Sequence, residues 1–274
     1  MKMLPFDNKS EFQVVVDMPE GTALEETGRV LDELAAAIAQ LPEVTDYQVY
    51  AGTSAPINFN GLVRQYYLRS GPELGDIQVN LVDKHHRDKQ SHEIAVAARP
   101  VLAEIGKRHG ASVKVVEVPP GPPVQAPLVA EIYGPFPEAQ RELTRTVRKV
   151  FDATPDVVDV DDSLEAERPR QVVRIDRQKA ALLGVNQADA VQALAAGLGG
   201  YDATYVHAGR ETYPIPVRLE LDVPDKADLA NVLALQVRSN SGARVPLSEI
   251  AVVEERPWDT SIYHKDLLPL TWVT

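Results

Sequence analysis

Hydrophobic and polar positions in the first part of the chain alternate with two different periods. Residues 11–18 contain a β-branched run that predicts a strand, and residues 44–51 alternate with the period of a second strand. Between them, apolar residues recur at helical spacing over residues 24–41. Thr22, followed three residues later by Glu25, matches the capping-box pattern of a helix start. The pattern predicts a β-α-β unit.

The following stretch predicts the second half of a larger unit. Residues 77–81 alternate as a strand, residues 91–110 place apolar side chains on one helical face, and residues 113–118 predict another strand. The order over residues 11–118 is then β-α-β-β-α-β, which is the ferredoxin-like split unit.

A proline-rich stretch separates this unit from a partial repeat of it. Four prolines and one glycine fill residues 119–123, which predicts a stiff linker because proline cannot continue a helix or a central strand. Beyond it, residues 128–133, 137–153 and 157–160 predict a strand, a helix and a strand, which indicates an internal duplication. The helix residues predicted to face inward are Leu143, Val147, Val150 and Phe151.

The last third of the chain has a different pattern. Residues 171–176 predict a strand that leads into a helix, with Gly184 as its C-cap and Asn186 as the N-cap of the next helix. Residues 201–213 alternate as a hairpin. Residues 267–274 predict a final apolar strand. Together with the preceding repeat, these elements predict an α+β fold.

Composition narrows the class of protein. Of 274 residues, 44% are hydrophobic and 25% are charged, which is typical of a folded globular protein. The formal net charge of −12 opposes binding to nucleic-acid phosphates. The absence of cysteine excludes disulfides, thiolate nucleophiles and thiolate metal sites. No run reaches the roughly 18 apolar residues of a membrane span.

Histidines are the first candidates for metal chemistry. His85, His86 and His92 fall close together, with Asp83, Asp88 and Glu93 nearby. No two of these histidines share a helix at the i, i+4 spacing that brings imidazoles onto one metal ion. We therefore interpret them as a solvated turn followed by a helix start and predict no metal site.

An acidic run raises the question of a calcium site. A calcium loop needs a glycine turn and a bidentate acid at fixed spacing, and the run has neither. It is interpreted as a solvated face or a domain junction. The run consists of Asp159, Asp161, Asp162, Glu165 and Glu167.

Catalytic patterns are missing from the sequence. No serine lies in a nucleophile-elbow glycine pattern, and the glycines at 197–200 follow a helix, whereas a phosphate loop opens one. We expect no enzymatic activity and no cofactor. A free-standing hydrolase is the alternative, which turnover in an esterase and phosphatase screen would reveal.

Aromatic side chains cluster beyond a Gly-, Pro- and Asn-rich loop at residues 52–61. Phe59, Leu62, Tyr66 and Tyr67 stand out because only 6% of the chain is aromatic. One interpretation is that they cover the core of their own domain. The other is an amphipathic pocket wall for small molecules.

Several segments resemble one family of transporters. Residues 171–185 contain an alternating strand that ends in Asp176, then Lys179-Ala180, then Leu183-Gly184-Val185. A Gly199-Gly200 pair, a hairpin with Gly209-Arg210, and the segments 213–217 and 245–251 follow. The chain is similar in these features to resistance-nodulation-division efflux pumps of the acriflavin-resistance type, in the second large periplasmic loop.

The resemblance implies a domain organisation. Residues 1–123 would be a first, ferredoxin-like porter subdomain, and residues 124–168 with 255–274 would be an incomplete second one. Residues 169–254 would be an inserted α+β docking subdomain. Members of the family are proton-driven trimers in the bacterial inner membrane, so the chain is expected on the periplasmic face of that membrane.

The resemblance also implies a site and partners. Substrates would be small amphipathic molecules, bound in the cleft between the porter subdomains behind the loop at residues 52–61. Partners would be the other pump subunits, a periplasmic adaptor and an outer-membrane channel, with no nucleic acid. The predicted substrate contacts are Ile57, Phe59, Leu62, Tyr66, Tyr67 and Val79.

Two alternatives remain within this resemblance. One is a metal-exporting pump that uses the three histidines. Copper and silver exporters of the family line the cleft with methionines, whereas the methionines here are Met1, Met3 and Met18, away from the corresponding strands. The other is a stand-alone small-molecule binding module.

Overall fold

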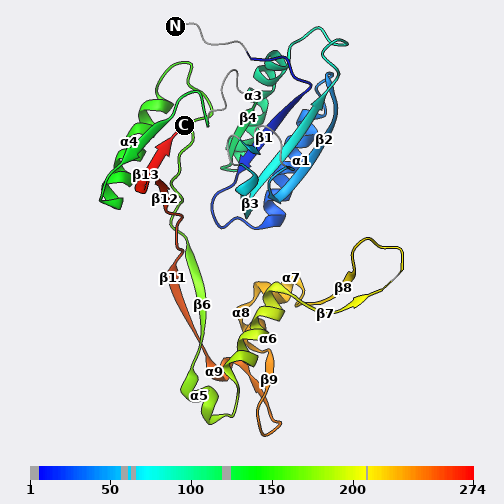
Figure 1. The fold of residues 1–274 in the computed structure, drawn as a ribbon, viewed down its shortest axis with the longest axis vertical. Helices are drawn as coiled ribbons and strands as arrows, with labels where there is room; N and C mark the ends of the chain where they lie inside the picture. The colour runs from blue at the N-terminus through cyan, green and yellow to red at the C-terminus, as the bar shows by residue number, and fades with distance from the viewer. Residues whose placement is uncertain (1–5, 57–60, 63–65, 119–124, 208) are drawn as a thin grey trace. The chain divides into compact units, whose positions relative to one another are not determined.

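The computed structural model describes residues 6–56, 61–62, 66–118, 125–207 and 209–274 (Figure 1). The chain divides into two compact units. The first unit comprises residues 1–168 and 259–274, and the second comprises residues 169–258. The fold is α+β with small antiparallel sheets, as the sequence predicts.

The first subdomain, within the described part of residues 6–118, is a four-stranded antiparallel sheet with two helices. The elements follow the order predicted for a ferredoxin-like unit, and the strands lie in the order β2-β3-β1-β4. Two split β-α-β halves give this order because each helix returns the chain across one face of the sheet. The elements are β1 (Glu11–Asp17), α1 (Leu24–Ile38), β2 (Val44–Thr53), β3 (Ser70–Leu81), α3 (Ser91–Arg108) and β4 (Ser112–Val116).

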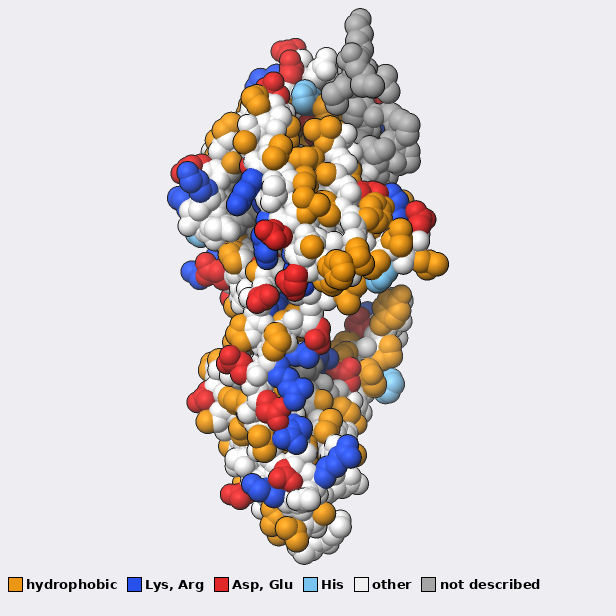
Figure 2. Space-filling view, turned by 90° about the vertical axis from the view of Figure 1, so that its left-hand side faces the viewer, with side chains coloured by type: hydrophobic (Ala, Val, Ile, Leu, Met, Phe, Trp, Pro, Cys, Tyr) orange, Lys and Arg blue, Asp and Glu red, His pale blue; other side chains and the backbone are white. Residues whose placement is uncertain are grey.

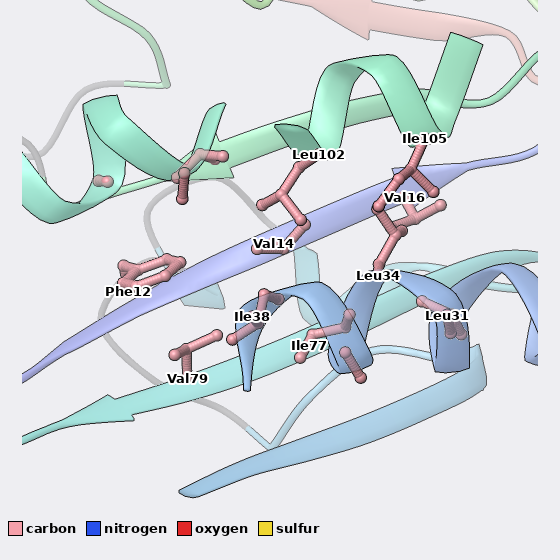
Figure 3. Packing of buried hydrophobic residues seen from close by; sticks show 14 of the residues in the cluster. Phe12, Val14, Val16, Leu31, Leu34, Ile38, Ile77, Val79, Leu102 and Ile105 are labelled. Carbon is pink, nitrogen blue, oxygen red and sulfur yellow. The ribbon is translucent and has the colours of Figure 1, made fainter. Parts of the chain in front are cut away.

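The core of this subdomain lies between the sheet and its helices. Side chains of β1 and β3 on one face of the sheet point towards α1 and α3 (Figure 3). Alternation along a strand puts Phe12, Val14 and Val16 on that one face, and all three are buried. The helices close the face with Leu31, Leu34, Ile38, Leu102 and Ile105.

Two details of the first subdomain differ from the sequence prediction. The capping box at Thr22 is wrong, because Ala23 is the N-cap and makes no side-chain cap. The Thr22 hydroxyl instead donates to the carbonyl of Pro19 at 2.6 Å, within the turn. Strand β3 begins at Ser70, seven residues before the predicted strand, because pairing with β2 and β1 extends it through a Gly- and Pro-containing stretch.

The second subdomain, residues 128–168 with 259–274, has one helix on a three-stranded sheet. Strands β5 (Ala130–Tyr133), β12 (Tyr263–Lys265) and β13 (Leu268–Val273) lie in the order β12-β13-β5, and α4 spans Pro137–Asp152. The strand predicted at 157–160 is wrong, because the backbone there has positive φ at Asp156 and Asp159.

Helix α4 presents an apolar stripe that the sequence analysis expects to be buried. Leu143 is 50% exposed and Val150 is 60% exposed, which corrects the prediction that they face inward, whereas Val147 and Phe151 are half-buried. Gln140 and Thr144 face the sheet instead, with Thr144 Oγ1 2.6 Å from Thr271 Oγ1. Figure 2, which views the side on which α4 lies, shows hydrophobic side chains gathered on this unit.

The internal repeat explains the exposed stripe. Aligning the proline after α1, Pro42, with the one after α4, Pro155, pairs Val30 with Leu143. Val30 is buried in a subdomain where α1 packs against α3 as well as the sheet. Helix α4 packs mainly against β5 and β13, so its matching position stays in solvent.

The second unit is built around its own small core. Strands β6 (Pro169–Ile175) and β11 (Ala251–Pro257) pair along their full length. As predicted, Asn186 caps a helix, since its side chain accepts a hydrogen bond from the backbone N–H of Ala188 at 2.9 Å. The other elements are α5 (Arg177–Leu182), α6 (Gln187–Gly199), β7 (Tyr201–Val206), β8 (Ile215–Leu219), α7 (Val223–Ala227), α8 (Leu229–Leu233), β9 (Gln236–Arg238), β10 (Arg244–Pro246) and α9 (Leu247–Ile250).

Candidate functional site

The structure does not gather all the predicted substrate contacts. Ile57 and Phe59 lie outside the described residues. Leu62 is 59% exposed, and Tyr66 is half-buried in the short 3-10 helix η1 (Tyr66–Leu68), which also contains Tyr67. Val79 is fully buried among the helices of the first subdomain, so its side chain is inaccessible to a ligand in this structure (Figure 3).

A buried polar face, which the sequence analysis missed, lies beside Tyr66. It occupies the side of the first sheet opposite the helices, because the register pairs Val15 with Asp76 on β3 and with Lys114 on β4. Residues directly opposite each other share one face of a sheet. We use the name polar face for the side chains of Gln13, Asp17, Arg69, Asp76 and Lys114.

Asp76 is the most deeply buried acid of the polar face. Its Oδ2 atom accepts hydrogen bonds from the backbone N–H of Ala55 at 2.8 Å and from Gln13 Nε2 at 3.1 Å. Its other oxygen has no hydrogen-bond partner, and neither does Oε1 of Gln13. Burial raises the pKa of Asp76, and the hydrogen bond from Ala55 and the charge of Arg69 only partly offset it.

Replacing Asp76 by asparagine should increase stability at neutral pH. Because the folded-state pKa is raised, ionisation of Asp76 lowers stability as pH rises from the ordinary aspartate pKa through the folded one. Asp76→Asn should therefore raise the free energy of unfolding by on the order of 1 kcal/mol at neutral pH, and the variant and the wild type should be equally stable in acid. Urea titrations at both pH values measure this, with exposed Asp32→Asn as the control. A less stable variant at neutral pH would show that the carboxylate charge supports the fold.

Arg69 links the polar face to the aromatic turn. Its guanidinium forms an ion pair with Asp17 at 2.6 Å and donates to the carbonyl of Val16 at 3.0 Å. It also lies over the ring of Tyr66, with 5.4 Å from Cζ to the ring centroid, which is cation–π geometry. Burial would lower the pKa of Arg69, but the charges of Asp17 and Asp76 outweigh it and raise the pKa.

Lys114 is the second buried cation of the polar face. Its ammonium forms an ion pair with Asp17 at 2.6 Å and a second one with Asp161. Burial would lower the pKa of Lys114, but the charges of Asp17 and Asp161 keep it raised. Acids and cations therefore alternate across the face, beside the ring of Tyr66.

The histidines do not converge on one point. His92 Nδ1 lies 2.9 Å from a carboxylate oxygen of Glu117, and its ring stacks on Phe6 with centroids 4.6 Å apart. The backbone N–H of His85 donates to the carboxylate of Asp83. Among the described residues, no group of three or more histidines and acids is placed to hold a metal ion.

Comparison with known proteins identifies the family. The AcrB/AcrD/AcrF family matches residues 1–274. The chain belongs to this family. The match confirms the resemblance to resistance-nodulation-division pumps read from the sequence. No helix in the described part of this family member is long and apolar enough to cross a membrane.

Curated relatives and solved structures agree with this assignment. The cobalt-zinc-cadmium resistance protein CzcA of Cupriavidus metallidurans is 30% identical over 142 residues, which cover 51% of this chain and 13% of the relative. The cation efflux system protein CzcA of an Alcaligenes strain matches equally well. Two crystal forms of a heavy metal efflux pump share the fold, with a TM-score of 0.72 and 20% identity over 99% of this chain. The chain spans 27% and 28% of those structures.

Proposed function

We propose that this chain is the periplasmic substrate-binding and docking region of a proton-driven efflux pump. The observation that carries the proposal is the match of the whole chain to the AcrB/AcrD/AcrF family. The interrupted first unit, with the second unit inserted between residues 168 and 259, supports it because the resemblance implies an inserted docking subdomain. The proposed role is binding without catalysis, on the periplasmic face of the inner membrane.

An exposed hairpin in the second unit supports a role in assembly. Strands β7 and β8 pair only with each other among the described strands. Both carry exposed apolar side chains, and Tyr213 before β8 is 80% exposed. A two-stranded hairpin is marginally stable alone in water. We propose that a neighbouring subunit of a trimer covers it, and that the adaptor and outer-membrane channel bind the assembled pump.

Small amphipathic molecules are the proposed substrates. The ring of Tyr66 offers apolar surface next to the charged Arg69 of the polar face, and Leu62, four residues earlier in the chain, is exposed. A ligand with an apolar body and a charged group fits such a combination, because the apolar part gains burial while the charged part finds a partner. Export of divalent metals is the second candidate, which the names of the CzcA relatives favour.

Calorimetric titration of the chain separates these two candidates. With the amphipathic dye rhodamine 6G we expect saturable heat, and Tyr66→Ala should weaken binding about fivefold, or about 1 kcal/mol. Leu182→Ala, on a residue 87% exposed in the second unit, is the control that should bind as the wild type does.

The same titration is repeated with Zn²⁺, Co²⁺ and Cd²⁺ on the same protein. Heat of binding with these ions and none with the dye would favour the second candidate, export of divalent metals, over small amphipathic molecules. Heat with neither would overturn the proposal that this region binds substrate on its own.

A further inference from the structure

The two subdomains of the first unit are joined by charged side chains. Asp159 and Asp161 belong to the acidic run that follows α4. The carboxylate of Asp159 accepts from Arg99 Nε of α3 at 3.1 Å, and Asp161 pairs with Lys114 of β4. The structure thus supports the domain-junction interpretation of this run.

The same segment makes two further contacts with the first subdomain a few residues later. Arg168 pairs with Glu73 of β3 at 3.0 Å. The backbone N–H of Ala166 donates to Glu20 Oε1 at 3.1 Å. Residues 159–168, which we name the junction segment, thus carry acids at one end and a cation at the other, and the first subdomain offers the opposite charges.

Apolar packing does not join the two subdomains in the same way. Every buried residue of the hydrophobic cluster in the first subdomain lies between Phe12 and Val115. No described residue of the second subdomain belongs to that cluster. Contacts between subdomains that are mainly polar separate more easily than a shared apolar core, because water replaces the lost hydrogen bonds.

Lys114 can lose its contact with Asp161 and still keep an acidic partner. A buried ammonium left without an acid is strongly destabilising. Lys114, however, is shared between Asp17 in its own subdomain and Asp161 in the other. When Asp161 leaves, the ammonium keeps its pair with Asp17, which it shares with Arg69, so the subdomains can separate without leaving Lys114 unpaired.

Asp161 is held firmly on the side of the second subdomain. Its backbone N–H donates to the carbonyl of Thr274 at 3.0 Å, and the N–H of Thr274 donates back at 2.9 Å. Thr274 directly follows β13, so Asp161 moves together with that sheet. The ion pair between Asp161 and Lys114 therefore depends on the position of the sheet of the second subdomain relative to the sheet of the first.

We propose that the junction segment is an electrostatic latch between the two subdomains, released at Asp159 and Asp161 while Lys114 stays paired with Asp17. Because Lys114 belongs to the polar face, release of the latch leaves the Lys114 ammonium open to a ligand on the side that Asp161 occupies. The latter consequence rests on the proposed function, whereas the latch itself is a property of this chain.

Distance measurements between spin labels test the latch. The chain has no cysteine, so Glu104→Cys on α3 and Arg145→Cys on α4 give one exposed label in each subdomain. In the labelled protein, Asp159→Asn with Asp161→Asn should raise the fraction of molecules at longer label distances about tenfold. The interaction free energy between paired charges shifts an equilibrium by about that factor. If this variant does not fold, Arg99→Gln removes the partner of Asp159 from the opposite side, and it should raise the same fraction by less, because Asp161 keeps its pair with Lys114.

Asp162→Asn is the matched control. Asp162 is the neighbouring acid, but its partner Arg148, at 2.6 Å, lies on α4 in the same subdomain. The control should leave the label distances unchanged. Unchanged distances in the Asp159 and Asp161 variant, or equal lengthening in the control, would overturn the latch. Neither result bears on the binding of dye or metal, so the proposed function is tested separately.

Discussion

Replacing Leu34 by alanine should lower the free energy of unfolding of the first unit by about 2–5 kcal/mol. Leu34 is fully buried and points from α1 towards Val16 of the central strand (Figure 3). Removing three carbon atoms there costs transfer free energy and leaves a cavity between two helices and a sheet that cannot easily collapse.

The two separate cores make this prediction specific to one unit. The second unit buries a different cluster, which includes Ile175, Leu247 and Ile250. Hydrogen exchange should therefore accelerate in α1, β1 and β3 of the variant and stay unchanged in residues 169–258. Leu182→Ala is the exposed control and should change stability by less than about 0.5 kcal/mol. Faster exchange in both units would show that they unfold together.

The first subdomain could be predicted from the sequence because its apolar pattern follows local geometry. The β-branched run of β1, the alternation of β2 and the helical stripe of α1 each match the element that the structure shows. Helix α4 follows the same rule locally, yet Leu143 and Val150 of its stripe are exposed, because burial of a stripe also needs a second element to cover it. Pattern reveals which face is apolar, and only the tertiary structure reveals whether that face is covered.

The polar face could not be predicted for the opposite reason. Gln13 lies between Phe12 and Val14, and Lys114 between Val113 and Val115, which in an antiparallel strand indicates a solvent-facing side. The structure buries both, because residues distant in sequence pair with them: Asp76 accepts a hydrogen bond from Gln13, and Asp17 and Asp161 form ion pairs with Lys114. A cation between Val113 and Val115 was the available signal, but its acids lie 97 and 47 residues away.

Replacing Asp17 by asparagine should destabilise the first unit by about 3–5 kcal/mol, because it leaves two buried cations with one acid fewer. Asp17 lies 2.6 Å from both Arg69 and Lys114. Urea denaturation followed by circular dichroism measures the loss. Asp7→Asn is the control in the same unit, because Asp7 is exposed in its pair with Lys9 and should leave stability unchanged.

The pH dependence of this loss tests whether charge is its cause. Burial would raise the pKa of Asp17, but the ion pairs with Lys114 and Arg69 outweigh it and lower the pKa. A lowered folded-state pKa means that Asp17 contributes its full stability above the ordinary aspartate pKa and loses it as pH falls through the folded value. The gap between wild type and Asp17→Asn should therefore be widest near neutral pH and narrow in acid. A gap of constant size would assign the loss to packing or hydrogen bonding of the side chain, because neither depends on its charge.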